Sequence, residues 1–216
     1  VEAIRQGRRI FSNIRKASTY VLSIHVPIAA LTLVPVLVGW PLILLPFHVA
    51  MLHMLIDPAC STVFEAQPGS ASQMSQPPRP PGTPMLDGAT LAWGIWQGVV
   101  VALACLAVFA WSYHTAVAEP GARALAFMTL LLSNAMLVVS NRSRMPGLWR
   151  LVRTLDAPGW AVLLGIAVFV LVLQTTPMLQ WFRLAAVGTE QWLLIGAAVA
   201  SAAAVIEGSK RLRRPR

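Results

Sequence analysis

Long apolar stretches separated by short polar segments run through most of this chain. Six of them approach the roughly 20 residues that a helix needs to cross a hydrocarbon core. They cover about 20–38, 42–64, 91–113, 122–140, 159–176 and 191–206. The turn Gly39-Trp40-Pro41 is short, so the first two helices should be antiparallel neighbours. The pattern predicts an all-α, polytopic membrane protein with six transmembrane helices.

The segment before the first apolar stretch has a different pattern. Residues 1–19 are basic, with apolar side chains at Ile4, Ile10 and Ile14, and we expect a cytoplasmic helical stalk that continues into the first span. The chain does not begin with Met, so we expect it to be the tail of a longer polypeptide. The predicted division is the stalk at 1–19, a transmembrane hairpin at 20–64, a Pro-rich cytoplasmic linker at 65–84, a four-helix transmembrane support region at 85–207 and a basic cytoplasmic tail at 208–216.

Charge is scarce and unevenly placed. Charged residues make up 12% of the chain and hydrophobic residues 56%, with a mean hydropathy of +0.66. Of the 17 Lys and Arg residues, all but Arg123 and Arg183 fall on one side of the six predicted spans. The positive-inside rule then places both termini in the cytoplasm of a multi-pass protein of the inner (plasma) membrane. Because the basic residues flank membrane spans, nucleic acid is not an expected partner.

A few polar residues lie inside the apolar stretches. In the run 44–60, Asp57 is accompanied by His48, His53 and Pro58. A carboxylate in hydrocarbon costs several kcal/mol, so an ion, a proton path or a buried partner must offset it. Hard cations prefer carboxylate and carbonyl oxygens, and Pro58 frees a carbonyl one turn earlier. The alternative is a structural aspartate bonded to helix N–H groups or to an arginine.

Two histidines are positioned to join Asp57. His53 lies four residues before it, on the same face of the helix, and His25 should face the same cavity from the antiparallel neighbour. Imidazole suits transition metals or protons. The alternative for both is a buried neutral histidine bonded to a backbone carbonyl. His48 lies closer to the membrane edge, and we interpret it as interfacial.

Other polar residues have structural interpretations. Gln97 and Gln174 are expected to be interhelical or interfacial. Glu207 is expected to be solvated or paired with Lys210 or Arg211. Cys60 and Cys105 lie in apolar runs and are interpreted as buried free thiols.

Two motifs carry a family resemblance. Gly7-Arg8-Arg9-Ile10-Phe11-Ser12-Asn13-Ile14-Arg15-Lys16 resembles the GRxIxxNIRK stalk of P-type cation-transporting ATPases. Ile56-Asp57-Pro58-Ala59-Cys60-Ser61, with Phe64-Glu65 and Pro77-Pro78-Arg79 after it, is similar to the sixth helix and following loop of bacterial members. A weaker similarity continues through Thr129, Asn134 and Ser140-Asn141-Arg142-Ser143. The chain thus resembles the fifth to tenth transmembrane helices of a calcium-pump-like enzyme.

The resemblance implies a set of cation ligands. Asp57 would be a ligand, His25 and His53 stand where related pumps have asparagine or glutamate, and Asn134 matches a glutamate of the eighth helix. The alternative for Asn134 is a helix–helix hydrogen bond. Ile28 and Ile56 replace two oxygen ligands, which argues against a two-calcium site and leaves one divalent ion, a transition metal or a proton.

The resemblance also implies a function. This chain would be the ion-translocating membrane part of an ATP-driven pump, with a cation bound around Asp57 and moved by alternating access. Its expected partners are the cation, the bilayer, and the missing N-terminal helices and cytoplasmic domains. The family's DKTGT and TGE motifs are absent, so no cofactor is expected here, and Mg²⁺ and ATP belong to the parent protein. A free-standing proton or metal permease or channel without ATP hydrolysis is the alternative, and a membrane scaffold is a third hypothesis.

Overall fold

The computed structural model describes residues 1–65, 67, 74, 84–142, 147, 152–153, 155–175 and 177–212, without the side chains of residues 56, 57 and 59–61. All regular elements in these ranges are helical, which confirms the all-α prediction. Most of the predicted linker 65–84 and the last residues of the tail lie outside the described residues.

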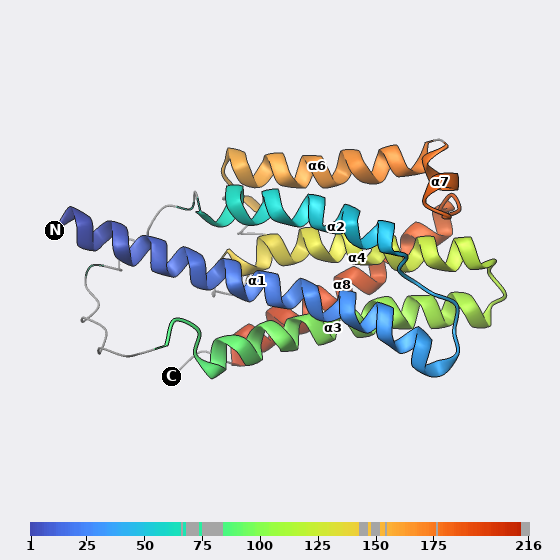
Figure 1. Cartoon of the computed structure of the whole chain (residues 1–216), viewed down its shortest axis with the longest axis horizontal. Coiled ribbons are helices and arrows are strands. Elements are labelled where there is room, and N and C mark those ends of the chain that lie inside the picture. Colours follow the sequence, from blue (N-terminus) through green and yellow to red (C-terminus); the bar gives the residue numbers. More distant parts are fainter. Residues whose placement is uncertain are drawn as a thin grey trace.

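The helices form an elongated bundle and alternate in direction (Figure 1). They are α1 (Glu2–Val38), α2 (Pro46–Ala59), the π-helix η1 (Cys60–Glu65), α3 (Gly88–His114), α4 (Glu119–Asn141), α6 (Ala157–Gln174), the short α7 (Met178–Trp181) and α8 (Thr189–Leu212). The start of α1 and the end of α8 lie at the same end of the bundle. We call this the N/C end; both termini are predicted to be cytoplasmic.

In the described part of the chain, five helices are long and apolar enough to cross a membrane: α1, α3, α4, α6 and α8. The second predicted span is instead divided. Its first residues belong to the loop before Pro46, α2 has 14 residues, and the next 6 form η1. The predicted count of six long spans is therefore not confirmed. Proline at position 58 removes a helical N–H, which weakens regular α-helix pairing just before η1 begins.

The stalk and the first span are one helix, as predicted. α1 has 37 residues and includes Pro27 and Pro35. It ends at Gly39, whose φ of 72° is the left-handed conformation that glycine adopts without strain. The first predicted hairpin follows directly, because α2 turns back along α1 (Figure 1).

Two glycines let α1 and α3 pack closely. A Cβ atom on Gly98 would lie 2.5 Å from the Cβ of Val26 and 2.9 Å from the carbonyl oxygen of Ser23. A Cβ on Gly94 would lie 3.1 Å from the carbonyl oxygen of Thr19. The Ser23 carbonyl has no helical donor, because residue 27 is proline. This Gly94–Gly98 seam fixes the two helices side by side with the same direction.

α4 is the central helix. Nearly all its side chains are buried, and it packs against α1, α3, α6 and α8. Phe127, Leu130 and Leu137 are fully buried in the core that it forms. α4 therefore has almost no face left for lipid, and its polar side chains, among them Thr129, Ser133 and Asn134, are buried with the apolar ones.

Ion pairs join the helices at the N/C end. Arg15 of α1 binds Asp87, the N-cap of α3, at 2.7 Å and donates to Thr90. Hydrogen bonds from the side chain and backbone N–H of Thr90, followed by the charge of Arg15, lower the pKa of Asp87 to about 2. Arg142 at the end of α4 likewise binds Asp156, the N-cap of α6, through both guanidinium nitrogens at 2.8 and 3.0 Å. That hydrogen bonding holds the pKa of Asp156 below its usual range.

A further ion pair fastens α8 to α4. Lys210 lies 2.7 Å from Glu207 and donates to the Ser140 carbonyl at 2.7 Å. Glu207 also accepts from the Ser140 hydroxyl at 2.8 Å and from the Gly147 N–H at 2.9 Å. The predicted pairing of Glu207 with Lys210 is confirmed. The Lys210 side chain is buried and that of Glu207 is largely buried, which the sequence pattern did not indicate.

Candidate cation site

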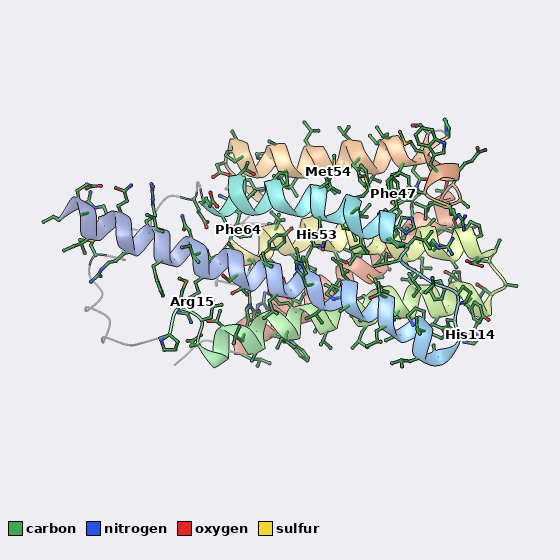
Figure 2. All side chains as sticks on the ribbon, viewed as in Figure 1. Arg15, Phe47, His53, Met54, Phe64 and His114 are labelled. Carbon is green, nitrogen blue, oxygen red and sulfur yellow. The ribbon has the colours of Figure 1, made fainter. Side chains whose placement is uncertain are left out.

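The two histidines predicted to converge are in contact. The rings of His25 on α1 and His53 on α2 have their centroids 5.2 Å apart. Figure 2 labels His53 on α2. The short connection after Gly39 returns α2 along α1 and brings the two rings to the same level. Both side chains are partly buried. Their proximity is confirmed, and their role as ligands stays a prediction.

The hydrogen bonding of His25 defines its tautomer. The Nδ1 atom lies 2.7 Å from the carbonyl oxygen of Val21, which can only accept a hydrogen bond. Nδ1 therefore carries the proton in neutral His25, and Nε2 keeps a lone pair. A lone pair on Nε2 can bind a cation or accept a proton.

His48 is oriented quite differently. Its Nδ1 accepts the Leu45 N–H at 3.1 Å, and its Nε2 lies 2.8 Å from the carbonyl oxygen of Phe182 and donates to it. Its side chain is fully buried in the first turn of α2, and the interpretation that it lies at the membrane edge stays a prediction. Both ring nitrogens are used, so His48 acts structurally and fixes the start of α2 to the loop after α7.

Asp57 lies on α2, one turn after His53. Its side chain lies outside the described part of the chain, so its role stays a prediction. Among the described side chains, no three His, Cys, Asp or Glu residues are grouped closely enough to hold a metal ion. Of the four predicted ligands, the side chains of His25, His53 and Asn134 are described.

The position of Asn134 along α4 can be judged from a ring contact between α4 and α2. The ring of Phe127 contacts that of His48, with centroids 4.8 Å apart. Asn134 is seven residues beyond Phe127, about two helical turns, so it projects from the same face. The helices α2 and α4 run in the same direction (Figure 1). Counting seven residues on from His48 along α2 gives position 55, between His53 and Asp57, as the level that matches Asn134.

The Asn134 side chain is buried, and its Oδ1 atom has no hydrogen-bond partner within the described residues. Within the described residues, Asn134 Oδ1 therefore does not form the helix–helix hydrogen bond that was the predicted alternative. Thr129 differs, because its hydroxyl donates to the Leu125 carbonyl at 2.7 Å. Asn134 therefore presents an acceptor that is free to bind an ion or a water molecule.

Two further buried polar residues, Gln97 on α3 and Ser133 on α4, have no role in the predicted site. Gln97 and Ser133 are fully buried, and neither Gln97 amide atom nor the Ser133 hydroxyl has a partner in the described part of the chain. In the sequence both lie within largely apolar helices, a pattern that equally indicates a helix–helix contact. Gln174, by contrast, accepts the Val187 N–H at 2.9 Å and is structural.

A groove follows α1 from the stalk to His25. It has a volume of about 770 Å³ and extends from Ile10 and Asn13 to His25, with Leu86 and Leu91 on its other wall. Its lining is mainly apolar, and His25 lies at its inner end. Along this groove, one face of the stalk is not covered by another part of the described chain.

Comparison with known proteins identifies the family. The model of the family "Cation transporting ATPase, C-terminus" matches residues 41–212. The chain belongs to this family of cation-transporting ATPase C-terminal regions. The family and the apolar helices together make it a multi-pass membrane protein.

Curated relatives of this cation-transporting ATPase region include bacterial proteins. It is 26% identical over 165 residues to the "Probable cation-transporting ATPase F" of Mycobacterium tuberculosis, covering 76% of this chain and 18% of that protein. It is 28% identical over 198 residues to the "Calcium-transporting ATPase" of Bacillus subtilis, covering 89% of this chain and 22% of that protein. The ATPase region thus spans about a fifth of the length of these relatives.

Proposed function

We propose that this chain is the ion-translocating membrane part of an ATP-driven cation pump, and that the cation binds at Asp57, His53, His25 and Asn134. The observation that carries the proposal is the contact between His25 and His53, with ring centroids 5.2 Å apart, one turn from Asp57 in a chain of this family. Asn134 adds an unpartnered acceptor at the same level.

The proposed ligands have distinct tasks. Asp57 supplies the negative charge that offsets the cost of a cation in hydrocarbon. His25 offers the Nε2 lone pair, and Asn134 offers a neutral oxygen. A carboxylate with imidazoles favours a transition metal or a proton over calcium, because imidazole is a softer ligand than oxygen. Alternating access would move the cation by repacking α2 against α1 and α4.

ATP hydrolysis would belong to the rest of the pump. Mg²⁺ and ATP would be bound in the part of the polypeptide outside this chain, and the groove along α1 would be covered by that part. The relatives support this arrangement, since about four fifths of their length lies outside the match. The Arg15–Asp87 pair would then couple stalk movement to α3.

The test is a survey of cations for phosphorylation of the full-length protein by ATP. We expect one divalent ion, one transition metal or acidic pH to stimulate phosphorylation in the wild type. Asp57→Asn should abolish the stimulation while the protein still folds. His25→Ala and His53→Ala should weaken the apparent ion affinity or shift its pH dependence.

Glu190→Gln is the matched control, since Glu190 is an exposed acidic residue in the first turn of α8. It should behave like the wild type. Normal ion-stimulated phosphorylation in Asp57→Asn would overturn the site. If no cation stimulates phosphorylation of the wild type, the assignment as a cation pump would be overturned.

A further inference from the structure

Gln97 is the most unusual buried residue that the proposed cation site does not use. Its side chain is fully buried in α3, and its Nε2 and Oε1 atoms have no partner within the described residues. An unpaired buried amide costs about 1–3 kcal/mol, so such groups nearly always bind something.

The packing of α3 fixes the direction in which Gln97 projects. Gly98 faces α1, and the indole N–H of Trp96 donates to Ser209 of α8 at 3.3 Å. Successive helical residues are about 100° apart, so Gln97 projects between α1 and α8. The opposite side of α3 is exposed at Ile95 and Val99. The third helix that α3 packs against is α4, so Gln97 points at α4.

The level of Gln97 on α3 matches that of the polar residues on α4. α3 and α4 are antiparallel and joined by a short turn after His114 (Figure 1). Gln97 lies 17 residues before His114, and Ser133 lies 14 residues after Glu119. At 1.5 Å per residue the two levels differ by about 5 Å, within one helical turn. Ser133 and the adjacent Asn134 also hold unpartnered polar atoms.

The chemistry of these atoms selects the ligand. Gln97 Nε2 can only donate, Gln97 Oε1 and Asn134 Oδ1 can only accept, and the Ser133 hydroxyl can do both. A cation would satisfy the oxygens and leave Nε2 unpaired. Water donates and accepts, and buried water typically makes about three hydrogen bonds to such groups.

We propose that Gln97 and Ser133 hold internal water between α3 and α4, and that this water fixes the rotation of α4 and so orients the adjacent Asn134 amide at the cation site. Gln97 is then a positioning residue that acts through water. The orientation step rests on the proposed function, whereas the water site does not.

The first measurement is a structure of the full-length protein at a resolution that shows ordered water. We expect water density within hydrogen-bond distance of both Gln97 and Ser133 in the wild type, and its loss in Gln97→Leu, which has no donor or acceptor. Ordered water elsewhere in the membrane domain but none beside Gln97 would overturn the water site. Because this result needs no transport, it can be read even if the pump assignment fails.

The second measurement is the cation concentration that gives half-maximal phosphorylation. Gln97→Leu and Ser133→Ala should each raise it about five-fold, the factor for one hydrogen bond of ordinary strength, with the maximal level unchanged. Gln97→Glu keeps the shape and an acceptor and should recover part of the affinity. Val101→Ala is the control, since it removes buried volume one turn away without removing a hydrogen bond. The positioning role would be overturned if water lies beside Gln97 but Gln97→Leu and Ser133→Ala keep the wild-type cation affinity. It would also be overturned if Val101→Ala loses as much cation affinity as these two variants.

Discussion

The Gly94–Gly98 seam between α1 and α3 allows a quantitative prediction. In Gly98→Ala, the added Cβ would lie 2.5 Å from the Val26 Cβ and 2.9 Å from the Ser23 carbonyl oxygen. Carbon atoms normally approach to about 3.5–4.0 Å, so the helices must separate by roughly 1 Å. Overpacking of this kind costs about 1–3 kcal/mol.

Alanine also has a better helix propensity than glycine, by up to about 1 kcal/mol. We therefore expect Gly98→Ala to lower the free energy of unfolding by about 1–2 kcal/mol. Gly165→Ala in α6 is the matched control, because a Cβ there meets nothing within 4 Å. That variant should be neutral or slightly stabilising.

The assay is unfolding of the purified protein in mixed micelles of dodecyl maltoside and increasing sodium dodecyl sulfate, followed by tryptophan fluorescence. The chain contains 8 Trp residues, which gives a strong signal. If Gly98→Ala unfolded at the same detergent fraction as Gly165→Ala, the close approach of α1 and α3 would be refuted.

Two further predictions concern the ion pairs at the N/C end. The pKa of Asp87 is lowered to about 2 from 3.8, so its ionised form adds stability above pH 3.8 that is lost as the pH falls through 2. Asp87→Asn should therefore melt below the wild type at pH 6, and the gap should close toward pH 2; an equal gap at both pH values would contradict the contacts of the ionised Asp87 carboxylate with Thr90 and Arg15. Lys210→Met should cost about 3 kcal/mol of unfolding free energy, because it leaves Glu207 buried with a charge and no cation. The double variant Lys210→Met/Glu207→Gln should be more stable than Lys210→Met alone, and a double variant that is equally unstable would disprove the buried pair.

The helices were predictable because each long apolar run must satisfy its own backbone hydrogen bonds in lipid. The same rule, with the short Gly39-Trp40-Pro41 turn, predicted that His25 and His53 would meet. The division of the second span into α2 and η1 was not predictable, since composition does not distinguish α from π pairing. Proline at position 58 was the visible signal, and it was interpreted only as a source of a free carbonyl.

Contacts between distant segments were beyond the sequence pattern. Arg15 and Asp87 are 72 residues apart, and the pattern gives no register between α1 and α3. The burial of Gln97 and of the Glu207–Lys210 pair likewise depends on which face each helix turns inward. An apolar helix with one polar residue fits a core, a lipid face and a ligand site equally well. The role of Asp57 remains a prediction from its type and position.

A cation site at Asp57 can be measured by equilibrium binding of the stimulating cation to the purified full-length protein without ATP. We expect saturable binding in the wild type and in Glu190→Gln, and binding about 100-fold weaker in Asp57→Asn, the loss expected when the carboxylate of a buried charged contact is removed. Wild-type affinity in Asp57→Asn would place the cation site elsewhere in the pump.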